Sequence, residues 1–209
     1  MVSTFNRLSN KLIYRWRDLG SFGLLTFALN KLLQHVFYQA QLDVYEYDLT
    51  DDLPALLLEG GFLDQEALLR LGYVKSVMFP NFVSERLKRG QKAYCLVIDG
   101  NLAHIDWVTE GYLNTGPDFS NYESDRVLGI YDCLTVPAYR RKGLYLDALQ
   151  QLLIYARESG FERALIAVDP DNLASRNVIV KAGFSLFECV RISCICSKFR
   201  IKKVVRNTQ

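Results

Sequence analysis

The sequence is poor in histidine, in net charge and in long apolar runs. Only two histidines occur in 209 residues, and neither has the spacing of a metal ligand. Cys194 and Cys196 alternate onto one strand face without histidine partners, so we predict no zinc site and no other metal centre. The formal net charge of +2 is too small to make nucleic acid the expected main partner.

Cysteine is scarce and its count is odd. Four of the five cysteines lie in apolar, strand-like runs, where cysteine behaves as a small hydrophobic residue. This indicates free thiols in a reducing cytoplasm. The first residues lack a short apolar core followed by small cleavage residues, so we also expect no secretory signal. Half of the residues are hydrophobic, which is typical of a globular protein.

Residues 1–40 form an amphipathic arm in this interpretation. Apolar residues recur at intervals of three or four from Phe5 to Leu19, beside a second stripe that carries basic residues. The next segment, residues 24–38, is more apolar but shorter than the roughly 20 residues of a membrane span. We expect a helical hairpin that packs on the following domain. Peripheral contact with an anionic membrane stays open as a second use of the arm.

Residues 41–209 show the mixture of periodicities typical of an α/β domain. An Asp99-Gly100 turn between alternating runs predicts a hairpin. A polar stretch from Glu110 to Arg126 predicts a long loop, where we place acceptor contacts. The predicted helices span residues 64–71, 82–88, 142–159 and 173–182, and the predicted strands span residues 42–47, 92–98, 102–109, 127–136, 163–168, 184–190 and 192–199.

The stretch from Tyr131 to Tyr145 is the most informative part of the chain. It passes from an apolar strand pattern through Pro137 and a basic glycine turn into a helical pattern. Amides from Arg141 onward would begin a helix without intrahelical acceptors, and the helix dipole adds about half a positive charge there. The segment therefore predicts a site for a pyrophosphate group.

A second motif follows at Asn172, and the two motifs together resemble the GNAT superfamily of acyl-CoA-dependent N-acyltransferases. The turn of that family is Arg/Gln-x-x-Gly-x-Gly/Ala, and its next helix begins with Asn-x-x-Ser/Ala and ends with Lys-x-Gly-Phe. The resemblance covers about residues 42–202 and implies a twisted mixed sheet of about seven strands flanked by helices. The matching residues are Arg140, Gly143, Asn172, Ser175, Lys181, Gly183 and Phe184.

The resemblance implies acetyl-CoA, or another acyl-CoA, as the co-substrate. Backbone groups of Leu134 and Val136 would face the pantetheine arm, in the gap where the strand of residues 127–136 diverges from that of residues 163–168. The chain departs from the family turn at its last position, where a tyrosine replaces glycine or alanine. The residues assigned to the pyrophosphate are Arg140, Arg141, Lys142, Gly143, Leu144 and Tyr145.

Asn172 has two explanations from the sequence. The resemblance implies contact with the pantetheine amide, whereas an asparagine three residues before Ser175 also fits a helix cap that contributes about 1 kcal/mol. The two roles are compatible. Ser175 itself is expected to serve the helix end or packing.

Asp132 is the predicted general base, because it lies on the strand beside the donor, where burial among apolar groups would raise its pKa. A structural aspartate held by backbone or tyrosine partners is the competing interpretation. The reserve candidates are His104, Asp106 and Glu110. Many family members place a proton-donating tyrosine where this chain has Ile179, which leaves water, Tyr131 or Tyr145 for that task.

The leading functional prediction is a cytoplasmic N-acetyltransferase that transfers acetyl from acetyl-CoA to an amine in a ternary complex. A small-molecule acceptor is favoured over a protein amine. A long-chain acyltransferase using acyl-CoA or acyl-carrier protein is one alternative, because residues 24–38 could shelter a chain. A catalytically silent acyl-CoA sensor is another, because Ile179 replaces the tyrosine.

Overall fold

The computed structural model describes residues 37–50, 60–71, 80–113, 122–195 and 199–206. The chain divides into two compact units, one made of Met1–Ala40 and Arg191–Lys203 and the other of Gln41–Val190 and Val204–Gln209. Every candidate site residue lies in the second unit. Residues 1–36 of the arm in which a helical hairpin was expected, and residues 114–121 of the loop expected to bind the acceptor, lie outside the described residues.

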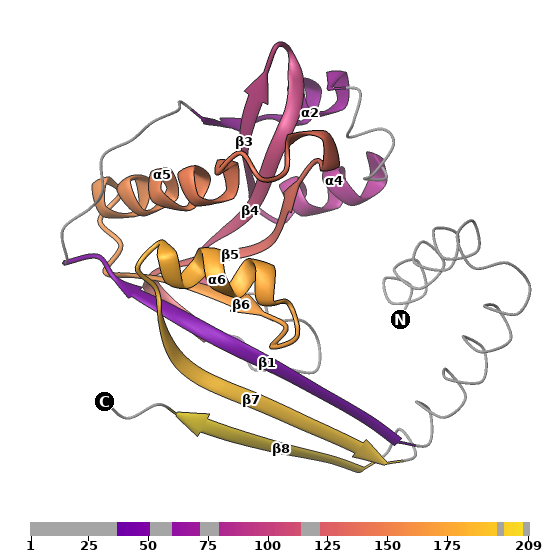
Figure 1. Ribbon diagram of the computed structural model, residues 1–209, viewed down its shortest axis with the longest axis vertical. Coiled ribbons are helices and arrows are strands. Elements are labelled where there is room, and N and C mark those ends of the chain that lie inside the picture. Colours follow the sequence, from indigo (N-terminus) through magenta and orange to yellow (C-terminus); the bar gives the residue numbers. More distant parts are fainter. Residues whose placement is uncertain (1–36, 51–59, 72–79, 114–121, 196–198, 207–209) are drawn as a thin grey trace, which may run out of the picture. The chain divides into compact units, whose positions relative to one another are not determined.

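Eight strands form one mixed sheet with the order β2-β3-β4-β5-β6-β1-β7-β8 (Figure 1). Strands β5 and β6 pair in parallel, whereas β2/β3, β3/β4, β4/β5 and β6/β1 pair antiparallel. The strands are β1 (Phe37–Asp48), β2 (Gly61–Leu63), β3 (Lys92–Ile98), β4 (Asn101–Leu113), β5 (Tyr122–Thr135), β6 (Arg163–Val168), β7 (Ser185–Ile195) and β8 (Phe199–Arg206).

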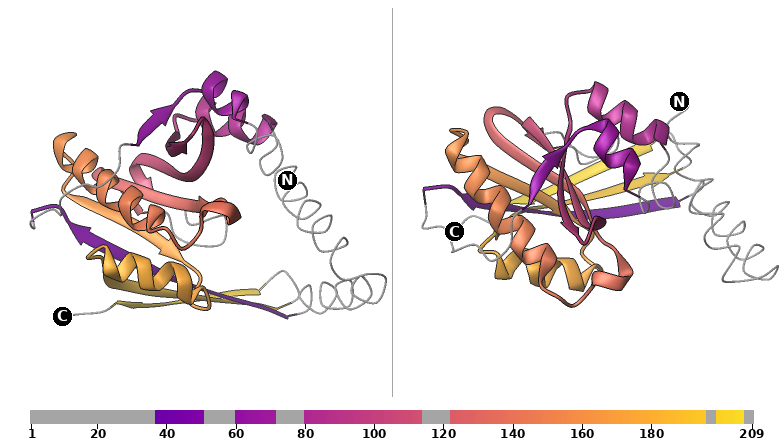
Figure 2. Two further views of the ribbon diagram at one scale, coloured as in Figure 1. Left: turned by 45° about the horizontal axis from the view of Figure 1, so that its top comes forward. Right: turned by 90° about the horizontal axis from the view of Figure 1, so that it is seen from above.

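Helices cover both faces of this sheet (Figures 1 and 2). The α-helices are α2 (Gln65–Arg70), α4 (Pro80–Lys88), α5 (Leu144–Glu158) and α6 (Leu173–Lys181), and a short 3-10 turn, η1, spans Pro137–Tyr139. α5 connects the parallel strands β5 and β6, as a crossover between parallel strands requires. Within the described residues, no helix has the length and apolar character needed to span a bilayer.

The expected α/β architecture is confirmed, with differences that include four strand ends. β1 begins at Phe37 rather than at residue 42. β4 and β5 extend to Leu113 and back to Tyr122, so strands occupy much of the stretch expected to be a loop. β7 continues through Arg191, where a turn was expected. Arg191 is exposed and no glycine, proline or asparagine lies beside it, so nothing in the local sequence ends the strand.

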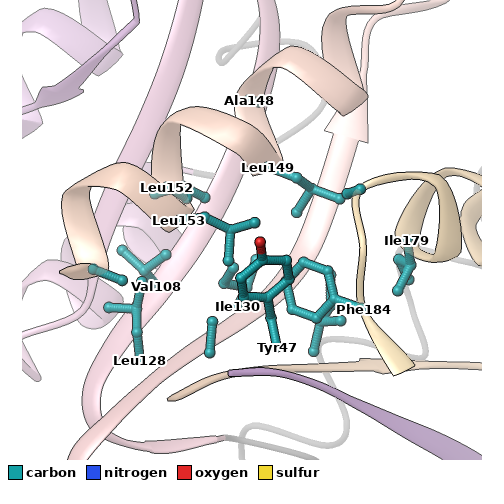
Figure 3. Packing of buried hydrophobic residues seen from close by; sticks show 14 of the residues in the cluster. Tyr47, Val108, Leu128, Ile130, Ala148, Leu149, Leu152, Leu153, Ile179 and Phe184 are labelled. Carbon is teal, nitrogen blue, oxygen red and sulfur yellow. The ribbon is translucent and has the colours of Figure 1, made fainter. Parts of the chain in front are cut away.

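The core between the sheet and α5 positions the start of that helix. Leu149, Leu152 and Leu153 are fully buried against strand residues such as Ile130. Each such side chain contributes about 1.5–3 kcal/mol by leaving water. Figure 3 shows these α5 leucines beside the Tyr47 ring. Helix α5 therefore lies firmly over the sheet, with its first residues next to the end of β5.

The Gly-Phe pair after α6 has a packing role. Gly183 adopts a φ of 99°, and a Cβ atom there would lie 2.7 Å from Cε2 of Tyr47. Phe184 packs edge-on against the Tyr47 ring, with centroids 5.6 Å apart. Glycine is therefore required by both the backbone conformation and the close approach of the ring.

The other face carries a second core under α2 and α4. Leu68 of α2 and Val83 of α4 are fully buried against strands β3, β4 and β5. Trp107 is the largest fully buried side chain of this cluster. The side chains of Arg86 and Tyr131 also lie on this face.

Candidate functional site

The parallel pairing of β5 and β6 ends well before β5 does. The paired positions run from Val127 opposite Arg163 to Ile130 opposite Ile166. β5 continues to Thr135 while paired with β4, and β6 continues to Val168 while paired with β1. The two strands therefore diverge after Ile130, as the sequence analysis expected.

A β-bulge lies at this point of β5. Between the pairs Ile105–Leu134 and Trp107–Tyr131, β4 has one residue whereas β5 has two, Asp132 and Cys133. Asp132 takes a left-handed backbone conformation with a φ of 48°. Bulges bend a strand and redirect its side chains, and they are frequent beside functional sites.

The backbone groups that face the diverging side belong to Cys133 and Thr135. The amide of Val136 donates to the Ala103 carbonyl at 3.0 Å, and the Val136 carbonyl accepts from the Tyr139 amide at 2.9 Å. Successive residues of a strand direct their backbone groups to opposite sides, so Leu134 also faces β4. The resemblance implied Leu134 and Val136 for the donor contact, but strand pairing, which the motif does not show, turns their backbone groups toward β4.

The basic turn after β5 has an unusual backbone conformation. Arg141 and Gly143 both adopt left-handed conformations, with φ values of 63° and 82°. The Arg140 side chain folds back, and its Nε donates to the Thr135 carbonyl at 3.2 Å. Alternating backbone conformations of this kind direct successive amides toward one point and favour an anion.

Helix α5 begins with unsatisfied amides at this turn. Gly143 is its N-cap and provides no side-chain hydrogen bond, and the first intrahelical bond runs from the Asp147 amide to the Gly143 carbonyl at 3.1 Å. The amides of Leu144 to Leu146 thus precede the intrahelical ladder. A Cβ atom at Gly143 would meet nothing within 4 Å, so no protein atom fills the space beside this residue.

Three exposed cations surround the helix start. Arg140, Arg141 and Lys142 are all solvent-exposed, and Lys142 Nζ lies 5.2 Å from the centre of the Tyr139 ring. Positive side chains, unsatisfied amides and the helix dipole all favour negative charge at one place. Contact of residues 140–145 with a pyrophosphate stays a prediction.

Asn172 caps helix α6. Asn172 is the N-cap residue of this helix, and its Oδ1 atom accepts a hydrogen bond from the Ser175 amide at 3.2 Å. The structural role considered for this asparagine is confirmed. Contact of its exposed side chain with a donor stays a prediction.

Asp132 is ion-paired rather than buried among apolar groups. Its carboxylate pairs with Arg86 of α4, and half of its side-chain surface is exposed (50%). Arg86 is itself buried, with its guanidinium 4.8 Å from the centre of the Trp107 ring and 5.0 Å from that of Tyr131. The expected burial of Asp132 is wrong, because the bulge turns this side chain toward the α4 edge.

A buried polar chain lies on the opposite face, beneath the start of α5. His104 and Asp106 are fully buried. His104 Nδ1 lies 2.7 Å from Thr135 Oγ1, and His104 Nε2 lies 2.9 Å from Asp106 Oδ1. With neutral imidazole, the Thr135 hydroxyl donates to Nδ1 and Nε2–H donates to the carboxylate. His104 and Asp106, the reserve candidates for the general base, are thus connected through Thr135 to the end of β5.

Cys133 and Tyr145 extend this chain toward the helix start. The Tyr145 hydroxyl lies within hydrogen-bonding reach of the Cys133 thiol, and the thiol lies beside the Asp106 carboxylate. Burial raises the pKa of both the thiol and the phenol well above their usual values. Both groups are therefore protonated at neutral pH. Sequence reasoning did not single out Cys133 or Thr135, although each lies on the key strand.

The remaining candidates lie away from the divergence. Glu110 is opposite Leu128, where β5 and β6 are still paired, and it binds Lys92 and Tyr155. Tyr131 donates to Gln91 on the α4 face. Ile179 is fully buried in the α5 core and offers no hydroxyl.

Residues 85–184 match the family model described as the acetyltransferase (GNAT) family. The match includes the bulged strand, the basic turn, α5 and the Asn172 helix. This stretch belongs to the GNAT family. It covers the open helix start and the diverging strands, so the GNAT domain contains the candidate site. Among curated protein sequences, none is similar enough to count as a match.

Solved structures of GNAT proteins share this fold. A protein of the family from Novosphingobium aromaticivorans gives a TM-score of 0.55 at 15% identity and covers 82% of this chain. One from Colwellia psychrerythraea gives 0.55 at 16% identity over 76%, and a GCN5-related N-acetyltransferase from Sphaerobacter thermophilus gives 0.54 at 14% over 87%. The chain spans 66%, 56% and 57% of the lengths of these three proteins.

Within the described residues, no group of histidine, cysteine and acidic side chains is placed to hold a metal ion.

Proposed function

We propose that the protein is an N-acetyltransferase that moves an acetyl group from acetyl-CoA to a primary amine by direct attack in a ternary complex. One observation carries the proposal: the open, amide-lined start of α5 adjoins the end of a strand that diverges from its parallel neighbour. A helix start of this kind fits a pyrophosphate, and a diverging strand edge fits the amide-bearing arm attached to it.

The residues present fit coenzyme A. The pyrophosphate would meet the amides of Leu144, Tyr145 and Leu146 and the charges of the basic turn. The arm would run beside the backbone of Cys133 and Thr135, which faces away from β4. No side chain at Gly143 obstructs this approach. Asn172, at the next helix start, is proposed to contact the same arm while it caps α6.

Positioning supplies much of the proposed catalysis. Holding an amine and a thioester in reactive geometry is capable of lowering a barrier by about 7–11 kcal/mol. The amine must first lose a proton, and Asp132, at the bulge, is the proposed base. Its carboxylate is ion-paired with Arg86 of α4. His104 and Asp106 form the alternative, because they reach the same strand from the other face.

The proposed acceptor is a small-molecule amine, in a reducing cytoplasm. A protein amine and a longer acyl group stay as alternatives. The alternative that is not an enzyme is an acyl-CoA sensor. The absence of a hydroxyl at Ile179 favours this alternative.

Native mass spectrometry and a thiol-release assay test this proposal. We expect the purified protein to bind acetyl-CoA, and we expect free thiol to appear when an amine panel is added. Binding without thiol release for any amine would favour the sensor. A co-purified long-chain acyl-CoA would favour the long-chain transferase, and failure to bind any acyl-CoA would contradict the proposal.

A further inference from the structure

We propose that Arg86 is a positioning residue for the donor: its ion pair with Asp132 holds the β-bulge of β5, and the bulge turns the backbone of Cys133 and Thr135 toward the arm of coenzyme A. The proposal rests on the function proposed above, because it concerns the same donor site. It assigns a role to a buried charge on α4 that the acetyl transfer itself does not use.

Arg86 is enclosed by side chains on the α4 face of the sheet. Only 7% of its side-chain surface is exposed. Its guanidinium lies 4.8 Å from the centre of the Trp107 ring and 5.0 Å from that of the Tyr131 ring. Tyr131 in turn donates a hydrogen bond to Gln91. Because aromatic faces attract cations, the two rings keep the guanidinium in one place, beside the bulge.

The partner of this charge is the residue with the strained backbone of the bulge. Asp132 has a φ of 48°, a left-handed conformation that costs free energy in residues other than glycine. Bulges that need a left-handed residue usually have glycine there. This chain has aspartate instead, and its carboxylate pairs with Arg86. Loss of the partner of a buried charge costs more than one strained residue, so the ion pair is able to hold this backbone conformation.

The bulge determines which backbone groups the donor meets. It places Asp132 and Cys133 opposite a single residue of β4. Beyond it, Cys133 and Thr135 face the diverging side, whereas Leu134 faces β4. A register change of one residue would exchange the two sets, because successive residues of a strand direct their backbone groups to opposite sides. Arg86 therefore acts on the donor arm through the bulge rather than by contact.

A merely structural role of Arg86 predicts a different result. Arg86 also connects α4 to the sheet, so its loss lowers stability in either case. General loss of structure weakens every ligand of the donor site, whereas a positioning role weakens only ligands that reach the bulge. Phospho-ADP, the nucleotide half of coenzyme A, carries the pyrophosphate without the arm. The two ligands therefore separate the basic turn from the bulge.

Calorimetry of wild-type protein and Arg86→Met with both ligands tests this role. We expect Arg86→Met to weaken binding of coenzyme A roughly 10-fold, as misplacement of one or two backbone hydrogen bonds predicts. Its affinity for phospho-ADP should be unchanged. Arg70→Met is the matched control, because it removes an arginine of an exposed ion pair on α2 and should change neither affinity.

Two double variants test the route through the bulge. Arg86→Met with Asp132→Gly removes the buried charge and supplies a residue that adopts the left-handed conformation without strain. Arg86→Met with Asp132→Ala removes the same charges but keeps the strain. We expect the first to bind coenzyme A within a few-fold of wild type, and the second to bind it roughly 10-fold more weakly. Neither leaves a buried charge unpaired, so this comparison decides the role even if Arg86→Met alone does not fold.

Three results would overturn the role of Arg86 and leave the proposed function intact. These are unchanged affinity of Arg86→Met for coenzyme A, an equal loss for coenzyme A and phospho-ADP, and equal affinity of the two double variants for coenzyme A. Failure of the wild-type protein to bind coenzyme A would instead reject the proposed function, and the positioning role with it.

Discussion

At the scale of single residues, two left-handed backbone conformations shape the candidate site. Gly143 and Arg141 turn the chain so that amides, not side chains, line the start of α5. At the neighbouring bulge, Asp132 takes a third left-handed conformation and points at Arg86. Non-glycine residues in this region are uncommon, and their occurrence beside diverging strands indicates a backbone shaped by function.

Gly143→Asp should nearly abolish binding of coenzyme A. The new carboxylate would lie among amides and cations that favour an anion, and it would repel the pyrophosphate. Gly143→Asn is the control, because asparagine has the same shape and tolerates the left-handed conformation without adding charge. Calorimetry should show a much larger loss for aspartate. Unchanged affinity in folded Gly143→Asp protein would remove the assignment of this site.

Asp132→Asn should lower turnover by roughly 10²–10⁴-fold with nearly unchanged affinity for coenzyme A, as removal of a general base predicts. Asparagine keeps an acceptor for Arg86 and suits the left-handed backbone, so the fold should persist. Steady-state kinetics across pH measure the effect. Turnover within a few-fold of wild type would make Asp132 structural and would transfer the role to the His104–Asp106 pair.

At the scale of secondary-structure elements, the close pairing of β4 with β5 determines where the candidate site can form. Gly129 is paired with Thr109 on β4 and with Leu165 on β6, immediately before the divergence. A Cβ atom at Gly129 would lie 2.2 Å from the Tyr112 carbonyl oxygen and 2.7 Å from Thr109 Oγ1. The β4 strand therefore crosses β5 too closely for any side chain there.

Gly129→Ala should lower the free energy of unfolding by about 1–3 kcal/mol or more, because the backbone of β4 must move. Gly61→Ala is the matched control in the same sheet, since a Cβ atom at Gly61 meets nothing within 4 Å. That substitution should be neutral or stabilise by up to about 1 kcal/mol. Thermal and denaturant unfolding of both variants provide the comparison. Equal stability of the two would contradict the close crossing.

At the scale of the whole molecule, residues 41–190 contain the candidate site, and the role of the N-terminal arm is still a prediction. The first strand begins at Phe37, so the arm that can be removed without cutting β1 is residues 1–36. The arm carries a basic stripe and an apolar stripe, which suit a membrane surface and a protein surface respectively.

Deletion of residues 1–36 should make the remaining protein aggregate or melt early, because we expect the apolar stripe of the arm to cover the domain. Melting curves of the full chain and the truncated chain measure this. Reversal of the charges of Arg7, Lys11 and Arg15 in the full chain is the control, since it should leave stability unchanged. A soluble, stable truncation that binds coenzyme A but no longer sediments with anionic liposomes would favour the anchor instead.

The sequence by itself determined most of the order of strands and helices, though not the short strand β2, and it also determined the turn before α5 and the cap at Asn172. These features depend on local chemistry: periodicity, glycine conformations and hydrogen bonds between near neighbours in the chain. They carry the family resemblance for the same reason.

Only the tertiary structure decided which groups meet. The register of β4 against β5 gave the diverging edge to Cys133 and Thr135 instead of Leu134 and Val136. The bulge moved Asp132 out to Arg86, 46 residues away in the chain. Pairings between distant segments depend on the packing of whole strands and helices, which no local pattern encodes. The same packing brought Tyr145 to Cys133 and so connected the helix start with the buried His104–Asp106 pair.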